Sequence, residues 1–457
     1  MKKRLSLILA AILLFTCTAC SNTASDPYSS ALSSLSSDAD TSGIGNAHTD
    51  GKIDFESVPA PEKSIPPSGN NSITKYTSEE VSGIINGTQK LTAANSLYVD
   101  APKSIDHVSS FYSGTTAMLP PKDGIENFLS MFKYLFPDHE FDESCFYYVG
   151  GSSTIEYDKD TWQAGEPEPV ITKFFNTVGE KYDELVNGEE ELLYFYYSEE
   201  LMPREHSVEA TLRSPFGSDI CMVNKGVCEK IAAESNGEET YFAHEHVFAS
   251  SYFEYVDSFY PDSGEVFKLL DREISIKDAV AFFEDYMNAL PSVITTSYLI
   301  HVNKVNVYKV RDDLCCYEYI YSRMYDGVPF DYVVNGSRNV RDNADMAFGG
   351  MIKSDDVDYF YGAFRTATVL DETVHSEIIP LYEAVMITAD SLTDYVDFEV
   401  ISVQFLYCCD KMIGYALGEA KNFVFPAWKL ILHNSNDDKD YICYVNALDG
   451  KFEYYRE

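Results

Sequence analysis

The sequence has few cationic residues for its length. Its 457 residues include 34 lysines and arginines against 73 aspartates and glutamates, which gives a formal net charge of −39 at pH 7. A chain of this charge repels nucleic-acid phosphates and anionic lipid headgroups, so we expect neither as a partner. It attracts cations, basic peptides or the basic patch of another protein. The same charge also keeps an exported protein in solution.

The sequence also lacks the short motifs of common catalytic sites. It contains no His-Glu-x-x-His, no Gly-x-Ser-x-Gly and no glycine-rich phosphate-binding loop. We therefore predict that the chain is not an enzyme, that it has no cofactor and that none of its residues is catalytic. Two carboxylates that meet only in the folded protein would leave no trace in a sequence this acidic, so a cell-wall or glycan hydrolase is an open alternative.

The apolar run at the N-terminus, residues 5–15, is too short for a transmembrane helix. Three cationic residues precede it, and small residues follow it up to Cys20. This order of positive charge, short apolar stretch and small residues predicts an export signal peptide over residues 1–20.

Cys20 stands at the predicted cleavage site. The stretch before it resembles a bacterial lipobox, although Cys17 takes the place that such boxes usually give to leucine. The resemblance implies that Cys20 becomes the new N-terminus and carries lipid, palmitate included. It also implies a lipoprotein on the extracytoplasmic face of a bacterial cell membrane, anchored there by that lipid. The alternative is an ordinary signal peptide that is cut near Ala19.

The segment after the signal, residues 21–75, is predicted to be a disordered tether. It is rich in serine and then in proline, and no apolar periodicity runs through it. Such a segment cannot bury enough apolar surface to offset the entropy of folding. A flexible chain of ~50 residues spans about 40 Å, which would lift the folded part off a membrane surface.

The remaining residues are too many for one ordinary hydrophobic core, so they are predicted to divide into domains. Residues 76–271 read as a β-rich N-terminal domain, and residues 272–457 read as a C-terminal α+β domain. The predicted class is α+β, rich in antiparallel strands, with helices packed on the sheets. Apolar periodicity and turn residues predict helices at 128–136, 276–290 and 378–392 and, among the strands, those at 145–149, 192–197, 252–256, 301–310, 315–325, 398–408, 427–432 and 441–446.

A helix followed by antiparallel strands occurs twice in residues 272–457, which suggests a diverged duplication of an α+β unit. Residues 426–429, a hairpin and residues 444–451 resemble the end of a PepSY-like domain. They are also similar to the extracytoplasmic regulators of cell-wall-sensing histidine kinases. Residues 325–329 resemble a turn in similar units of exported Firmicute proteins. The resemblance implies a lipoprotein of unknown function that acts as an inhibitory, binding or regulatory module.

Two histidines form the best candidate for a metal site. On a strand, His244 and His246 would lie on the same face, and His206 or a carboxylate could be a third ligand for zinc. The default interpretation is a solvated strand face, because nine histidines in one chain make such a pair unsurprising.

Eight cysteines remain once Cys17 and Cys20 are set aside. An even number in an exported chain permits disulfides, and Cys221 and Cys228 have the spacing of a bridged hairpin. The adjacent pairs at 315–316 and 408–409 lie within apolar strands, where one member of each would face inward as a small hydrophobe. We therefore predict buried thiols for most cysteines, with a Cys221–Cys228 disulfide as a candidate.

The sequence as a whole predicts a lipid-anchored extracellular protein with a non-enzymatic role. It would bind or regulate a protein or peptide of the cell envelope. The alternatives are the hydrolase named above and a solute-binding receptor. A receptor of that kind usually alternates strands and helices around parallel sheets, which the pattern in residues 272–457 does not favour.

Overall fold

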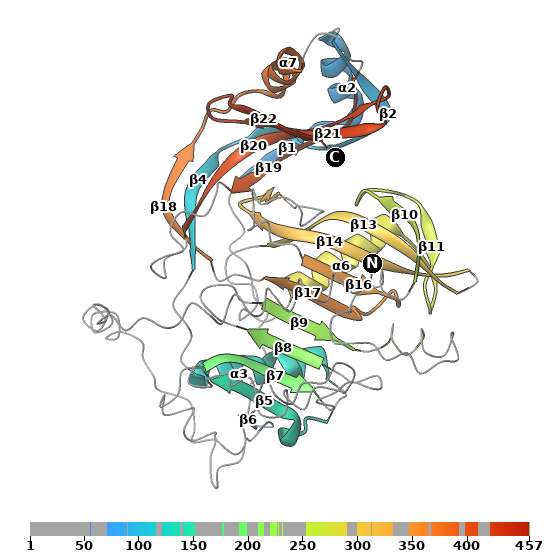
Figure 1. Cartoon of the computed structure of the whole chain (residues 1–457), viewed down its shortest axis with the longest axis vertical. Coiled ribbons are helices and arrows are strands. Elements are labelled where there is room, and N and C mark those ends of the chain that lie inside the picture. The colour runs from blue at the N-terminus through green and yellow to red at the C-terminus, as the bar shows by residue number, and fades with distance from the viewer. Residues whose placement is uncertain are drawn as a thin grey trace, which may run out of the picture. The chain divides into compact units, whose positions relative to one another are not determined.

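The computed structural model describes Phe55 and residues 71–88, 90–115, 121–137, 140–150, 176–177, 192–198, 209–213, 220–225, 227, 231, 253–289, 299–311, 313–331, 347–363, 367–392, 398–409 and 421–456. These residues belong to one compact unit that spans residues 48–457. They form an α+β fold dominated by antiparallel strands, as the sequence predicts, with two large sheets (Figure 1).

The smaller of these two sheets has seven strands, in the order β18-β4-β20-β19-β2, with β21 and β22 added beside β20. β2 pairs with β19 in parallel, and the other pairings are antiparallel. Helices α2 (Ser78–Gly87) and α7 (Leu381–Ser391) pack on one face of it. The strands are β2 (Leu91–Asp100), β4 (Val108–Thr115), β18 (Ala367–His375), β19 (Phe398–Cys409), β20 (Lys421–Asn434), β21 (Lys439–Asn446) and β22 (Phe452–Arg456).

The larger sheet has thirteen strands, in the order β10-β13-β14-β16-β17-β9-β8-β7-β5-β6, with β11, β12 and β15 beside this path. Helix α6 (Ile276–Asn288) covers one face of β13 and β14. The strands are β5 (Phe146–Gly150), β6 (Asn176–Thr177), β7 (Leu192–Ser198), β8 (Glu209–Arg213), β9 (Ile220–Asn224), β10 (Glu254–Phe259), β11 (Val266–Lys268), β12 (Glu273–Ser275), β13 (Leu299–Arg311), β14 (Leu314–Tyr325), β15 (Val328–Pro329), β16 (Ala347–Met351) and β17 (Tyr359–Ala363).

A two-stranded sheet and two helices complete the described fold. Strand β1 (Ile73–Lys75) pairs with β3 (Pro102–Ile105) in a separate two-stranded sheet. Helix α3 (Pro121–Leu135) and the 3-10 helix η5 (Glu143–Cys145) precede β5. β1 lies within the segment predicted to be tether. Phe55, from the same segment, stacks on Phe141 with ring centroids 4.8 Å apart.

Helix α6 shows how the sequence sets a local structure. Ser275 caps its first turn by accepting a hydrogen bond from the backbone N–H of Asp278. Further along, Glu284 and Asn288 lie one turn apart and accept hydrogen bonds from the backbone N–H groups of Val302 and Ile300. These N–H groups belong to the part of β13 that β10 does not reach. The helix therefore satisfies the open edge of a strand while its apolar face covers the sheet.

Both sheets take strands from either side of the predicted domain boundary at 271/272. Strand β9 pairs with β17, and strands β2 and β4 pair with β19, β18 and β20. In Figure 1 the blue and cyan strands β2 and β4 lie beside the orange and red strands from the C-terminal end. The first and last parts of the described chain therefore build the seven-stranded sheet together.

Most of the predicted elements are present with small differences in length. α3 covers most of the helix predicted at 128–136, and α6 and α7 match the two predicted in the C-terminal region. The strand predictions correspond to β5, β7, β10, β13, β14, β19, β20 and β21. The predicted duplication of the α+β unit stays a prediction.

The cysteines in the paired positions lie on both faces of their strands. Cys315 packs in the core under α6 and Cys316 packs on the opposite face, while Cys408 and Cys409 divide in the same way in β19. Burial raises the pKa of the Cys443 thiol to about 12. None of these five residues forms a disulfide, and all of them except Cys409 are buried. The described residues thus agree with the expectation of buried cysteines that act as small hydrophobes.

Among the helices described, none is long and apolar enough to cross a membrane.

Candidate functional site

A row of polar side chains crosses the seven-stranded sheet on the face opposite α2 and α7. Asp100 pairs with Gln404, Gln404 with Lys429, and Lys429 with Tyr444, each on a neighbouring strand. The residues before and after each of them pack in the core under the helices, so the four side chains share the other face. All four residues are buried. We call Asp100, Gln404, Lys429 and Tyr444 the polar row.

One end of the polar row holds a buried ion pair. The Nζ of Lys429 lies 2.7 Å from Oδ1 of Asp331, and the two side chains are 3% and 5% exposed. The hydroxyl of Tyr444 donates a hydrogen bond of 2.7 Å to Oδ2 of the same carboxylate. Asp331 therefore has both of its carboxylate oxygens held by residues of the polar row.

The backbone around Asp331 connects the two large sheets. Asp331 follows β15, which forms a hairpin with β14 of the thirteen-stranded sheet. Its backbone N–H donates a hydrogen bond of 2.8 Å to the carbonyl of Tyr407 in β19, and Phe330 forms an isolated parallel bridge with Tyr407. Residues 330–331 thus pair with the edge of β19 at Tyr407, beyond the part of β19 that pairs with β2. This backbone contact positions the Asp331 carboxylate.

The other end of the polar row centres on Asp100. Its Oδ1 lies 2.6 Å from Nζ of Lys75 in β1, and its Oδ2 lies 3.1 Å from Nε2 of His301 in β13. On the far side of the imidazole, Nδ1 lies 3.6 Å from Oε1 of Glu284 in α6. His301 therefore stands between two carboxylates, one from each side of the junction between the sheets.

The two carboxyl groups beside His301 have pKa values that shift in opposite directions. Burial opposes ionisation of Asp100, but the nearby imidazole of His301 and the ammonium of Lys75 outweigh it and lower the pKa. For Glu284, burial is the largest effect and raises the pKa, although His301 and the Val302 N–H act against it. A catalytic acid and base need pKa values that differ in this way. Ion pairs that only join two structural elements produce the same difference in pKa.

Four buried polar atoms in and beside the polar row have no hydrogen-bond partner. They are Oδ2 of Asp100, Nε2 of His301, Oε1 of Gln404 and Oγ of Ser402, which is two residues from Gln404 on the same face of β19. Buried polar groups are usually satisfied, because leaving one unpaired costs about 1–3 kcal/mol. The middle of the polar row and its Asp100 end therefore keep hydrogen-bonding capacity that the Lys429–Asp331 end does not.

A second polar cluster surrounds the turn between β14 and β15. Asp326 and Gly327 have φ values of 49° and 80°, the positive angles that a two-residue hairpin turn of this kind requires. A Cβ on Gly327 would lie 2.6 Å from Cδ1 of Ile73, so the glycine also permits the close approach of β1. This turn belongs to residues 325–329, where the sequence resembles a turn of exported proteins.

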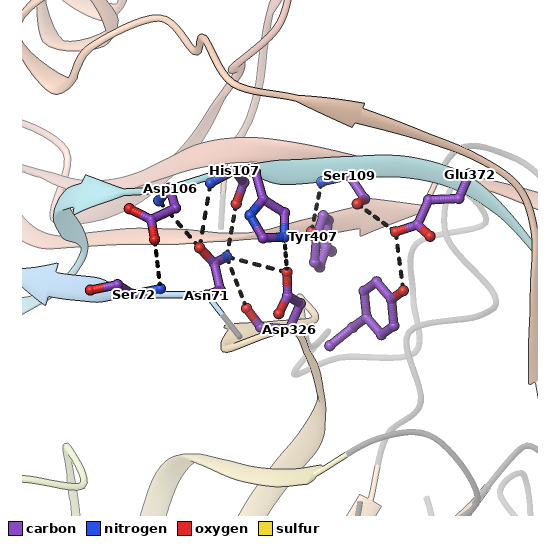
Figure 2. Close-up of polar contacts among 9 residues, drawn as sticks. Asn71, Ser72, Asp106, His107, Ser109, Asp326, Glu372 and Tyr407 are labelled. Carbon is purple, nitrogen blue, oxygen red and sulfur yellow. Dashed lines mark hydrogen bonds and ion pairs between the residues drawn. The ribbon is translucent and has the colours of Figure 1, made fainter. Parts of the chain in front are cut away.

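Asn71 joins that turn to the one between β3 and β4, as Figure 2 shows. Its Nδ2 donates hydrogen bonds to the carbonyls of His107 and Asp326, at 2.8 and 3.2 Å. Its Oδ1 accepts from the backbone N–H of Asp106 at 3.2 Å. Nε2 of His107 lies 2.8 Å from the Asp326 carboxylate, whose pKa is raised by burial in spite of the imidazole. One amide side chain thus closes the contact between the two turns.

The same cluster continues from β4 through three hydroxyl groups, those of Ser109, Tyr325 and Tyr407 (Figure 2). Oγ of Ser109 donates a hydrogen bond of 2.6 Å to Glu372, which also accepts one of 3.1 Å from Tyr325. The buried hydroxyl of Tyr407 accepts from the backbone N–H of Ser109 at 3.1 Å. Burial raises the pKa of Tyr407. These contacts bind the β14–β15 hairpin to the seven-stranded sheet at several points.

A different feature lies at the edge of the thirteen-stranded sheet. Four of the seven exposed large hydrophobic side chains in the described residues fall within residues 255–270, in and around β10 and β11. The two strands contact each other through Phe259 and Phe267, whose ring centroids are 5.5 Å apart. We call these four residues the β10–β11 surface; they are Tyr255, Val256, Val266 and Leu270.

The residues predicted to be functional from the sequence lie almost wholly outside the described part of the chain. This holds for Cys20, His244, His246 and Cys228, while Cys221 is placed in the backbone of β9. No group of three His, Cys, Asp or Glu side chains among the described residues is arranged to hold a metal ion. The predictions of lipidation, of zinc and of a Cys221–Cys228 disulfide stay predictions.

The residues of the polar row were not identified from the sequence. The available signal was a single polar residue within an apolar strand, as with Lys429 in β20 and Gln404 in β19. A polar residue that alternation places on a buried face needs a partner. Asp331 and His301, the partners of Lys429 and Asp100, come from distant parts of the chain, so no local pattern pairs them.

Comparisons with protein-family models and with curated proteins give no match to this chain. Among solved structures, an uncharacterized protein from Eubacterium rectale is similar at a TM-score of 0.42 and 11% sequence identity. The similarity covers 80% of this chain and 92% of that one.

Proposed function

We propose that the chain is a membrane-anchored extracellular lipoprotein, lipidated at Cys20, whose folded part binds a protein or peptide of the cell envelope without catalysing a reaction. The C-terminal region would be a PepSY-like module of regulatory type. The sequence of residues 1–20 supports the anchor. The β10–β11 surface is the observation that carries the binding role.

Exposed apolar side chains on the β10–β11 surface are concentrated in one short stretch. Single exposed hydrophobic residues are common on proteins, but a group of them indicates a place where another molecule docks. Tyr255 and Val256 lie on β10, which ends the described path of the sheet, and Val266 lies on β11, which pairs with β12 and β14. An extended segment of a partner can contact such an edge through both its backbone and its side chains.

The charge around the β10–β11 surface favours a basic partner. Four carboxylates within the same stretch are exposed, at Glu254, Asp257, Asp262 and Glu265, against the single cation of Lys268. Lys268 is itself paired with Asp313 at 2.7 Å. An extended segment that carries lysine or arginine would therefore meet complementary charge at its docking site.

For the alternative function, a hydrolase, the candidate pair of catalytic carboxylates is Asp100 and Glu284. Their pKa values shift in opposite directions, as a catalytic pair requires. His301, however, lies between them and interacts with both, so each carboxylate already has a partner within the fold. This use of the pair favours binding over hydrolysis as the function.

Site-specific crosslinking in cells tests the binding role. Tyr255 is replaced by a benzophenone-bearing phenylalanine in the full chain, and crosslinked peptides are identified by mass spectrometry after irradiation. We expect one envelope protein to be captured through a lysine- or arginine-rich segment. Tyr382 on α7 is about equally exposed and provides the matched control position, where this capture should not occur.

A charge reversal completes the test. Asp257→Lys should reduce the yield of the Tyr255 crosslink, because it places a cation where the basic segment docks. Glu383→Lys, an exposed position on α7, should leave the yield unchanged. Equal crosslinking from Tyr255 and Tyr382, or capture that ignores Asp257→Lys, would argue against a docking site on the β10–β11 surface.

A further inference from the structure

We propose that Lys429 and Asp331 condense to an intramolecular amide bond, which joins the β14–β15 hairpin covalently to strand β20 of the seven-stranded sheet. The starting geometry is the ion pair at one end of the polar row, with Nζ and Oδ1 2.7 Å apart. The two residues are 98 positions apart in the sequence. The bond would therefore close a long ring across the junction of the two sheets.

Burial separates this pair from the other lysine–carboxylate pairs in the described part of the chain. It is the only one of them in which both side chains are less than one-tenth exposed. Lys268 and Asp313 have the same distance of 2.7 Å, but their side chains are 48% and 70% exposed. In water such a pair stays ionised, whereas a buried pair pays a large desolvation penalty for its two charges.

The condensation proceeds from the neutral forms of the two groups, an amine and a carboxylic acid. Transfer of one proton from the ammonium of Lys429 to the carboxylate of Asp331 removes both charges at once. An amine is a nucleophile only when it is unprotonated, and desolvation in an apolar pocket is a known way to reach that state. Leu406, Cys408 and Ala427, which share this face of the sheet, supply apolar surroundings near the pair.

The condensation balances without an oxidant or another reactant. Nζ of Lys429 attacks Cγ of Asp331 and forms the C–N bond, and one C–O bond of the carboxyl group breaks. Of the three hydrogens on the original ammonium, one stays on the amide nitrogen and two leave with the oxygen as water. No atom changes its oxidation state overall, and the leaving group is a neutral molecule.

The fold holds both reacting groups in place. Asp331 is fixed through its backbone N–H to Tyr407, and the Tyr444 hydroxyl donates a hydrogen bond to Oδ2, where it stabilises negative charge as Cγ becomes tetrahedral. Lys429 lies between Gln404 and Tyr444 on the neighbouring strands. Reactants held in this way behave as if they were present at very high concentration.

Peptide mass spectrometry of the full wild-type chain tests the proposal directly. The protein is purified, kept at neutral pH, denatured and digested with trypsin. We expect residues 324–338 linked to residues 422–439, with a combined mass lower by one water molecule and no cleavage after Lys429. Recovery of the two segments only as separate peptides, with cleavage after Lys429, would overturn the proposal.

Two variants show whether burial and the amine are the causes. Lys429→Arg keeps a cation beside Asp331 but cannot react, because the guanidinium is not deprotonated in proteins, so the linked peptide should disappear. Lys268→Met, at the exposed pair, should leave the amount of linked peptide at the wild-type level. A linked peptide that survives in Lys429→Arg would show that another residue forms the bond and would refute the assignment.

Denaturing gel electrophoresis gives a second readout on the same samples. A chain that keeps a closed ring of this length after denaturation is more compact and migrates faster than the open chain. Wild type should therefore run ahead of Lys429→Arg under reducing conditions, in which disulfides make no contribution. Equal mobility, together with separate peptides, would identify the contact as an ion pair alone.

Discussion

The two ends of the polar row hold a lysine and an aspartate in different surroundings. At one end Lys429 and Asp331 are both buried, and at the other Asp100 is buried while Lys75 is 61% exposed. The N–O distances are nearly equal, at 2.7 and 2.6 Å. Distance therefore does not separate the two ion pairs, whereas exposure to water does. The same pair of residue types is therefore shielded from water at one end of the polar row and partly exposed to water at the other.

The largest effect is expected at the closed end of the polar row. Lys429→Ala leaves the carboxylate of Asp331 buried without its cation and also removes the proposed amide bond, so we expect a loss of at least about 3–5 kcal/mol of unfolding free energy, the cost of breaking a buried pair. Urea unfolding of the variant and of wild type measures the difference.

The double variant Lys429→Met, Asp331→Leu is the control for that loss. It removes both charges and fills the space with apolar groups, so it should recover the part of the stability that the lone buried carboxylate costs, but not the contribution of the proposed amide bond. If Lys429→Ala costs under about 1 kcal/mol, this end of the row contributes no more than a surface pair does, and the comparison between the ends fails.

A smaller effect, with a pH dependence, is expected at the Asp100 end. Asp100→Asn removes a buried charge that lies 2.6 Å from Nζ of Lys75 and 3.1 Å from Nε2 of His301, and we expect this to cost about 1.5–3 kcal/mol of unfolding free energy in total. The folded-state pKa of Asp100 lies below its usual value near 3.8. Its contribution to stability is therefore complete above that pH and is lost as pH falls through the folded-state value.

Unfolding measured between pH 7 and pH 2 checks this sign. Wild type should lose stability more steeply than Asp100→Asn below about pH 4, because only wild type must protonate this carboxylate. Parallel curves for the two proteins would show that Asp100 titrates alike in the folded and unfolded chain. Ionisation of Asp100 would then not explain how the two ends of the polar row differ.

The same argument shows which parts of the fold the sequence could predict. Helix α6 and the strands β13, β14 and β19–β21 follow from local patterns: a serine cap, apolar periodicity, and turns of polar residues. The pairing of β2 and β4 with strands some 300 positions later carries no local signal. For that reason the predicted boundary at 271/272 reflects composition, while each sheet is assembled from both sides of it.

The candidate site could be predicted only in part for the same reason. Lys429 within an apolar strand indicates a buried charge that needs a partner, but the sequence has 73 acidic residues from which to choose. Asp331 becomes that partner because a hairpin from the other sheet occupies the edge of β19. A single lysine can thus be identified as unusual from the sequence, although its contact depends on tertiary structure.

Glu284 gives a prediction of opposite sign to that for Asp100. Burial raises its folded-state pKa above the usual value near 4.5, so its ionisation destabilises the fold as pH rises through that range. Glu284→Gln keeps an oxygen that can accept from the Val302 N–H and removes the charge. We expect a gain below about 1 kcal/mol at pH 7 and none below pH 4, measured by urea unfolding at both values. A loss of stability at pH 7 would mean that the charge on Glu284 is needed for its contact with His301.

The smallest effect is expected where the lysine is in water. Lys75→Met removes the exposed partner of Asp100 while His301 remains, and exposed pairs contribute about 0–1 kcal/mol. Lys268→Met, at a pair in which both side chains are exposed, should produce no measurable change in unfolding free energy.

Salt distinguishes the exposed Lys75 from the buried Lys429, because screening acts on exposed charges and much less on a buried pair. In urea unfolding at low and high salt, the Lys75→Met difference should shrink and the Lys429→Ala difference should persist. If both differences shrink equally, the two ends of the polar row are in similar surroundings and burial does not explain their contrast.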